Sequence, residues 1–245
     1  MPVRDKTAAL IVIGNEILSG KVVDTNSTFL AQELRKIGVA LRRIVVIPDE
    51  IDEIAAAVRA VQPAYDVVFT SGGVGPTHDD VTIAGVARGL GRQVVRHPMI
   101  EQKLLELFGE QINEARLKMS EIPEGAELVY ERALSFPALK VENIYILPGI
   151  PELFRSKFLS IKERFAVDPF FLRVVYTGES ETAIAALLNQ TLEAFPEVLL
   201  GSYPKLGEAD YRVRITLESK DREYVDRALR HLLALLPQGA VLRTE

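Results

Sequence analysis

The chain has 245 residues, of which 48% are hydrophobic, enough for one large domain or for a large and a small one. Its net charge of −5 argues against binding along a nucleic-acid backbone, which requires a basic face. Because the chain has no cysteine and only three histidines, disulfides, thiolate zinc sites and thiol nucleophiles are excluded, and any metal must take oxygen ligands.

The amino terminus and the apolar runs bear on where the protein works. The first predicted strand begins soon after Met1, which leaves no room for a signal sequence, and no apolar run is long enough to span a bilayer. We therefore expect a cytoplasmic protein that binds neither nucleic acid nor membranes.

Apolar strands alternate with helices over roughly the first two thirds of the chain. Strands are predicted over residues 7–13, 41–47, 65–70 and 144–147, and helices over residues 25–37, 51–62, 81–90 and 152–165. Such an alternation predicts an α/β domain with a mostly parallel sheet covered on both faces. Ligands of these sheets gather beyond the carboxyl ends of the strands. The polar segments that follow the strands would meet there, namely residues 14–16, 48–50, 71–80 and 148–152.

The pattern changes near residues 167–169. Strands are predicted over residues 171–176, 197–203, 210–218 and 240–243, and helices over residues 181–194 and 221–236. This βαββαβ order is that of the ferredoxin-like split motif. We predict two domains, residues 1–168 and a small α+β domain of residues 169–245.

Residues 67–82 form the most informative segment. An apolar strand ends at Thr70, and glycines then remove the side chains that would keep an anion away from backbone N–H groups. Two adjacent carboxylates precede an apolar helix, so the segment predicts a phosphate-binding loop with a place for a cation. It is neither a P-loop nor the GxGxxG fingerprint. The alternative is a tight strand-to-helix turn with Asp79 or Asp80 as the helix N-cap.

Five ordered motifs make the sequence similar to the CinA amino-terminal family, which has the MoaB/Mog-type molybdopterin-binding fold. These motifs are residues 13–18, 24–26, 48–50, 71–80 and 147–152. A closer likeness, carried by residues 76–82, 136–137 and 141–145, is to the amino-terminal domain of eukaryotic FAD synthases. The sequence departs from CinA at residues 131–137, where the pocket wall near Ser135 is expected to differ. It has no counterpart of the nicotinamide-nucleotide deamidase domain, so we do not expect deamidase activity.

The resemblance implies ligands that carry phosphate. Similar proteins hydrolyse ADP-ribose or FAD with a metal, whereas Mog-type relatives bind and adenylate molybdopterin. The resemblance therefore implies a homodimeric nucleotide pyrophosphatase that uses Mg²⁺, Mn²⁺ or Co²⁺, with K⁺ as a further candidate. A nucleotide- or pterin-binding module without turnover and a Mog-type adenylyltransferase are the alternatives.

Four carboxylates are the candidates for catalysis and metal binding. By the resemblance, Asp80 matches the loop carboxylate of the Mog-type site and Asp49 matches a second one; Asp79 remains an alternative ligand. Each of the three could instead cap a helix. Glu16 could complete a set of oxygen ligands or act as general base, or could simply start a helix.

The candidates for contact with phosphate or nucleotide lie in the same loops. Asn26 could bind a polar edge of the ligand or cap its helix, and Gly149 and Pro151 would shape a loop over the ligand. The full set is Gly14, Asn26, Ser71, Gly72, Gly73, Gly75, Thr77, His78, Gly149 and Pro151.

Overall fold

The computed structural model describes residues 6–129, 137–207 and 210–245, which form two compact units, residues 1–167 and residues 168–245. The predicted change near Ser135 lies outside the described residues. No helix among the described residues is long and apolar enough to cross a membrane.

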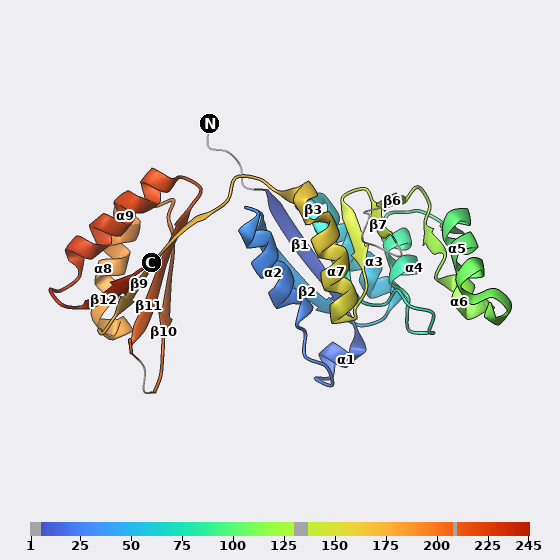
Figure 1. Cartoon of the computed structure of the whole chain (residues 1–245), viewed down its shortest axis with the longest axis horizontal. Helices are drawn as coiled ribbons and strands as arrows, with labels where there is room; N and C mark the ends of the chain where they lie inside the picture. Colours follow the sequence, from blue (N-terminus) through green and yellow to red (C-terminus); the bar gives the residue numbers. More distant parts are fainter. Residues whose placement is uncertain (1–5, 130–136, 208–209) are drawn as a thin grey trace. The chain divides into compact units, whose positions relative to one another are not determined.

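The first unit is built on a six-stranded, mostly parallel sheet, as the sequence predicted (Figure 1). Its four neighbouring parallel strands are β2, β1, β3 and β8. Strands β7 and β6 extend the β8 side through antiparallel pairs, so that β7 runs against the other five strands. The strands, in sheet order, are β2 (Ala40–Ile47), β1 (Thr7–Ile13), β3 (Val67–Ser71), β8 (Ile144–Leu147), β7 (Ala138–Val141) and β6 (Glu127–Val129).

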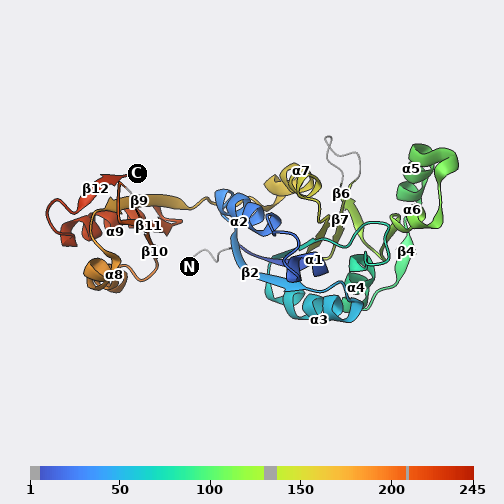
Figure 2. The same cartoon turned by 90° about the horizontal axis from the view of Figure 1, so that it is seen from below.

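Helices cover both faces of this sheet (Figure 2). Successive side chains of a strand point to opposite faces, so Leu10 of β1 belongs to the core under α2 and α7, and Ile11 to the core under α3 and α4. The first core combines aliphatic side chains with a group of aromatic rings, in which the ring of Phe69 is 5.5 Å from that of Phe158. The four helices are α2 (Asn26–Lys36), α7 (Pro151–Ile161), α3 (Ile51–Val61) and α4 (Thr82–Gly89).

Short elements complete the first unit. Helix α1 (Asn15–Leu18) follows β1 directly, and three 3₁₀ turns cover Gln62–Ala64, Gly109–Gln111 and Lys162–Phe165. The segment between α4 and β6, for which the sequence analysis predicted no element, folds as β4 (Val94–Arg96), α5 (Pro98–Phe108), α6 (Glu114–Lys118) and β5 (Glu121–Pro123). Strands β4 and β5 pair antiparallel, and β5 lies in contact with α4.

The second unit is a four-stranded antiparallel sheet with the order β10-β11-β9-β12. The chain order βαββαβ and this strand order are those of the predicted ferredoxin-like motif. Helices α8 (Glu181–Ala194) and α9 (Arg222–Leu235) pack on the face that carries Val175 and Ile215. The strands are β9 (Phe171–Thr177), β10 (Leu199–Pro204), β11 (Val213–Ser219) and β12 (Val241–Thr244).

Two glycines let α4 approach α3 closely. A Cβ atom at Gly85 would lie 2.5 Å from the Cβ of Ile54, and one at Gly89 would lie 2.7 Å from the Cβ of Val58. Real Cβ atoms do not come this close, so the helices would have to separate to admit a methyl group.

We expect Gly85→Ala to lower the free energy of unfolding by about 1–3 kcal/mol, because overpacking outweighs the helix propensity of about 1 kcal/mol that alanine contributes. Denaturant unfolding measures the change. Ala56→Gly, at an exposed position of α3, is the control for propensity alone and should cost about 1 kcal/mol. A Gly85→Ala protein more stable than the parent would contradict the close packing.

Candidate functional site

The glycine loop, residues 71–80, leaves the carboxyl end of β3 in a backbone conformation that requires glycine. Gly72 has φ of 109°, and a Cβ there would lie 2.1 Å from the carbonyl oxygen of Ile13. Gly73 has φ of 63° and faces the Thr82 side chain. The hydroxyl of Thr82 donates to the Gly72 carbonyl at 2.8 Å, and the backbone N–H of Thr82 donates to the Gly73 carbonyl at 3.0 Å. The first turn of α4 therefore holds the loop by its carbonyl groups.

The N–H groups of the same loop are left available. Within the described part of the chain, the backbone N–H groups of Gly73, Val74 and Gly75 donate no hydrogen bond, and all three residues are partly exposed. Successive free N–H groups in a turn make an anion-binding concavity. The glycine spacing predicted N–H groups open to an anion, and phosphate binding by them stays a prediction.

Asp80 closes the far end of the loop. Its Oδ2 accepts the Thr77 N–H at 2.8 Å and also accepts the Thr77 hydroxyl. It does not cap α4, whose N-cap is Val81, and neither does Asp79. The alternative, in which Asp79 or Asp80 is the N-cap of the helix, is therefore wrong, and Asp80 instead accepts hydrogen bonds within the loop.

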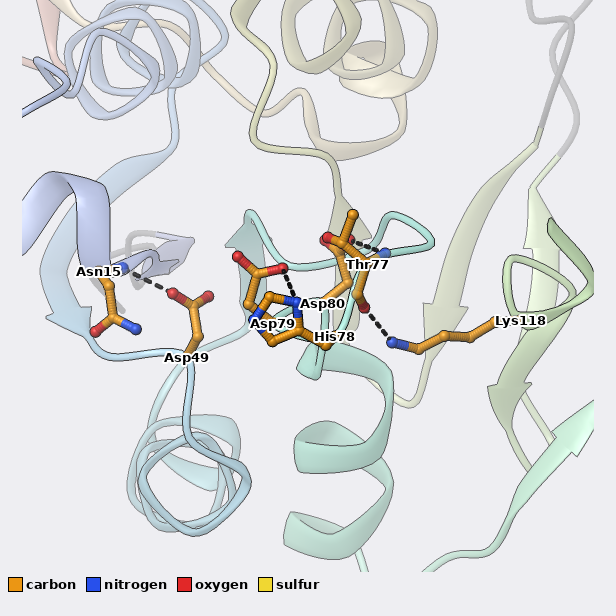
Figure 3. Close-up of polar contacts among 7 residues, drawn as sticks. All are labelled: Asn15, Asp49, Thr77, His78, Asp79, Asp80 and Lys118. Carbon is orange, nitrogen blue, oxygen red and sulfur yellow. Dashed lines mark hydrogen bonds and ion pairs between the residues drawn. The ribbon is translucent and has the colours of Figure 1, made fainter. Parts of the chain in front are cut away.

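Lys118 brings a positive charge to the loop from α6. Its Nζ donates to the Thr77 carbonyl at 2.6 Å (Figure 3). The sequence analysis missed this residue, because the 41 residues that separate it from Thr77 carry no pattern that pairs them. Lys118 also lines a small pocket of about 110 Å³ with Gly73, Gly75 and Asp80, which we call the loop pocket. Free N–H groups, an ammonium group and a carboxylate thus share one small space.

Asp49 and Glu16 lie at the neighbouring strand ends. Asp49 Oδ2 accepts the Asn15 N–H at 2.7 Å (Figure 3) and does not cap α3, whose N-cap is Glu50. Glu16 is exposed in the first turn of α1, and its carboxylate folds over Gly14, where a Cβ would lie 2.5 Å from Oε1. Among the described residues, no hydrogen bond or ion pair engages the Glu16 carboxylate.

Asn26 connects three segments and does not cap its helix, since Asp24 accepts the Ser27 N–H instead. The Asn26 Nδ2 donates to the Ser71 hydroxyl at 2.9 Å and to the Gly149 carbonyl at 2.8 Å. Its Oδ1 is buried and has no partner within the described structure. A buried acceptor without a donor is costly, so this oxygen is a ready partner for a ligand donor.

A second small space, of about 50 Å³, lies beside Asn26. We call it the strand-end pocket, and its walls include Glu16, Asn26, Ser71, Gly149 and Pro151. Five of the predicted site residues are thus brought together here, whereas the loop pocket contains Gly73, Gly75 and Asp80.

Asp79 and His78 lie at the surface of the glycine loop. The His78 side chain is 97% exposed, and its Nδ1 is 3.9 Å from Asp79 Oδ1 (Figure 3). The Thr77 side chain, the Asp79 backbone N–H and the nearby His78 and Lys118 hold the pKa of the Asp79 carboxyl below its usual range. Asp79 is therefore ionised at neutral pH.

The predicted metal ligands do not form a cage. Within the described residues, no group of three or more His, Asp and Glu side chains could hold a metal ion. Mg²⁺ is commonly held by one or two carboxylates together with substrate phosphates and waters. Asp80, beside the free N–H groups of the loop, fits a cation of this kind, which binds together with the phosphate.

Comparisons with known proteins agree with the sequence motifs. Residues 9–166 match the family described as a probable molybdopterin binding domain, and residues 169–245 match the middle domain of FAD synthase. The protein CinA from Thermoplasma acidophilum, whose function is unknown, is 32% identical in its crystal structure, with a TM-score of 0.61, over 66% of this chain and 98% of that one. These matches confirm the two predicted resemblances and the MoaB/Mog-like fold.

Sequence matches to two further relatives extend over both units. A protein from Archaeoglobus fulgidus is 37% identical over 227 residues, which are 93% of this chain and 96% of that protein. A probable FAD synthase from Caenorhabditis elegans is 35% identical over 264 residues, which cover 96% of this chain and 51% of that protein. The chain thus spans about half the length of the FAD synthase relative.

We expect Asn26→Ala to lower the free energy of unfolding by about 1–3 kcal/mol, because the buried Ser71 hydroxyl and the Gly149 carbonyl lose their donor. Urea unfolding measures the loss. Asn15→Ala is the matched control: Asn15 is exposed and only its backbone N–H bonds Asp49, so its change should stay within about 0.5 kcal/mol. Equal losses in the two variants would show that Asn26 does not brace the site.

Proposed function

The chain belongs to the family of the probable molybdopterin binding domain, and we propose that it is an enzyme that hydrolyses the phosphoanhydride bond of a dinucleotide such as ADP-ribose or FAD. The products are AMP and the phosphorylated remainder of the substrate. The family match supports a ligand of the nucleotide or pterin class, and the FAD synthase relatives support a dinucleotide within that class.

The observation that carries this proposal is the run of free N–H groups at Gly73, Val74 and Gly75 beside Lys118. A pyrophosphate is a strongly hydrated anion. Its transfer from water to the protein costs less free energy when N–H dipoles and an ammonium group replace the lost water molecules. The loop is also preorganised, because Gly72 and Gly73 are fixed through their carbonyl groups by Thr82. The N–H groups therefore need little rearrangement to meet a phosphate.

In the proposed reaction, a water oxygen forms a bond to one phosphorus and the bridging P–O bond breaks. The bridging oxygen leaves on the second phosphate, and the proton of the water passes to a carboxylate. Glu16 is the preferred acceptor, because its carboxylate is exposed and no hydrogen bond or ion pair among the described residues engages it. Asp49 is committed in part to the Asn15 N–H and has a supporting role.

Asp80 is the proposed ligand of the divalent cation, with Asp79 as the alternative. When bound, Mg²⁺, Mn²⁺ or Co²⁺ would neutralise negative charge on the phosphates and favour attack by water. Thr77 binds one oxygen of Asp80 and so fixes the direction of the other. K⁺ would act as a further counter-ion of the phosphates.

A turnover assay distinguishes the proposed hydrolase from the two alternatives. A binding module without turnover would bind ADP-ribose or FAD and release no AMP, and a Mog-type adenylyltransferase would require a nucleoside triphosphate and a pterin. Incubation of ADP-ribose and of FAD with each divalent cation, with and without K⁺, followed by chromatography for AMP, distinguishes the three.

We expect Asp80→Asn to reduce AMP release by about 100-fold or more, because the substitution removes a ligand charge and keeps the volume of the side chain. The amide oxygen can still accept both Thr77 donors, so circular dichroism and thermal unfolding should match the parent protein. Turnover is measured at several cation concentrations.

Asp79→Asn and Asp52→Asn are the matched controls for Asp80→Asn. Asp52 is 82% exposed on α3 and pairs with Arg88, so Asp52→Asn should leave turnover unchanged. Normal turnover by Asp80→Asn at low cation concentration, combined with a loss in Asp79→Asn, would transfer the ligand role to Asp79.

We also expect two chains to associate through the second unit. The sheet face opposite α8 and α9 carries Leu172, Leu199 and Tyr203, each between 45% and 49% exposed and placed on one face by the strand register. The same register places Glu218 and Arg214 on this face, so its surface is mixed. Covering its apolar side chains would favour a dimer. Light scattering at micromolar concentration should give twice the mass of the chain, and Leu172→Glu with Leu199→Glu should reduce it to that of one chain. A monomer mass for the parent protein would contradict the association.

A further inference from the structure

A large apolar pocket of about 370 Å³ lies within the first unit, and its walls include Val74 and Pro148 from the two predicted loops but none of the predicted site residues. Helix α5 contributes Ile100, Leu104, Leu107 and Phe108 to its walls, and α7 contributes Leu153. Its volume falls in the range of pockets that bind small molecules, which are mostly apolar with a few polar groups. None of Glu16, Asp49, Asp79 and Asp80 lines it, whereas Val74 of the glycine loop does.

The apolar pocket adjoins the loop pocket. Val74, Met119 and Leu139 line both of them, so the two spaces share a wall. Val74 is also one of the residues whose N–H is free. A ligand with phosphate at these N–H groups would therefore have its next group beside the apolar pocket.

The rim of the apolar pocket exposes large apolar side chains. Leu107 is 61% exposed and Leu153 is 50% exposed, on two different helices that line the same space. Exposed apolar surface around a concavity is typical of a binding site, because a ligand that covers it releases water.

Polar groups are confined to one part of the wall. Ser156 and Lys157 of α7 line the pocket, and Lys157 Nζ donates to the Pro137 carbonyl at 2.7 Å. Burial lowers the pKa of Lys157 to about 8, so that the side chain is still mostly protonated at pH 7. The pocket thus offers apolar walls and one edge with hydrogen-bond donors.

We propose that the apolar pocket binds a planar aromatic ring of the ligand whose phosphates lie on the glycine loop, with Lys157 donating to an acceptor on the edge of the ring. The inference rests on the proposed function for the position of the phosphates. A ring fits because it presents apolar faces and polar edges, whereas a sugar would leave its hydroxyl groups without partners against these walls. The flavin and the adenine of a dinucleotide share this chemistry.

Riboflavin and adenosine test the pocket without phosphate. Each carries one of the two rings, so binding depends neither on the glycine loop nor on hydrolysis. Riboflavin binding is followed by its fluorescence and adenosine binding by calorimetry, both with the full chain. We expect the parent protein to bind at least one of them, and the tighter binder identifies which ring the pocket takes.

The test variant combines Leu107→Ser and Leu153→Ser, which remove apolar contact at exposed positions where folding should be little affected. Its Kd for the bound ring should rise about tenfold. The matched control combines Leu105→Ser and Leu159→Ser, on the same two helices, with 45% and 44% exposure and outside the pocket. Its Kd should equal that of the parent protein. Lys157→Met, which keeps the apolar stem and removes the ammonium group, should raise the Kd several-fold.

Failure to bind either ring, or equal affinity in the test and control variants, would overturn the inference. An unchanged Kd in Lys157→Met would remove the proposed contact at the ring edge. The outcome is separable from that of the proposed function: AMP release without ring binding contradicts only the pocket, and ring binding without AMP release contradicts only the hydrolysis.

Discussion

The close approach of three backbone segments is the constraint on which the site depends. A Cβ at Gly72 would lie 2.1 Å from the Ile13 carbonyl oxygen, and one at Gly149 would lie 3.1 Å from the Gly72 Cα. The ends of β1, β3 and β8 can come this close only because Gly72 and Gly149 have no side chain. The β3–β8 ladder then continues one step further, since the Gly72 N–H donates to the Leu147 carbonyl. The next N–H groups, beyond the last ladder bond, are the ones left free.

Three carboxylates near these strand ends have a polar neighbour, whereas no hydrogen bond or ion pair among the described residues engages that of Glu16. Asp80 is bound by Thr77, Asp49 by the Asn15 N–H, and Asp79 lies near His78. Asp80 and Asp49 are therefore each held in place by a donor that leaves part of the carboxylate open. Lys118 brings a positive charge to the loop, because its Nζ donates to the Thr77 carbonyl. A phosphate brought to the free N–H groups would increase the negative charge, and for this reason a cation that binds with the phosphate suits the site better than a permanent metal cage would.

The sequence predicted the parts of the fold that depend on local pattern. The apolar run 7–13 coincides with β1, and helix 181–194 coincides with α8. Predicted strand 65–70 is shorter in the structure, because a 3₁₀ turn occupies Gln62–Ala64 and β3 begins only at Val67. The helix predicted over residues 152–165 ends at Ile161 and continues as a 3₁₀ turn. The segment from β4 to β5 escaped prediction because its strands have three residues each and those of β4 are exposed, so no alternation could be read. Lys118 and the apolar pocket were missed with that segment.

Helix capping illustrates why residue roles are harder to predict than elements. Asp49, Asp79 and Asn26 each stand where a cap is favoured by composition, and none of them caps. Asp49 instead bonds a backbone N–H from a segment 34 residues away, and Asn26 bonds a carbonyl from a segment 123 residues away. Such a side chain can either cap its own helix or form a hydrogen bond with a distant segment. Here the distant hydrogen bond forms, because the strand ends bring together partners that the local sequence does not reveal. Polar residues at the carboxyl ends of parallel strands that do not cap a helix are therefore those most directly available to hold a ligand.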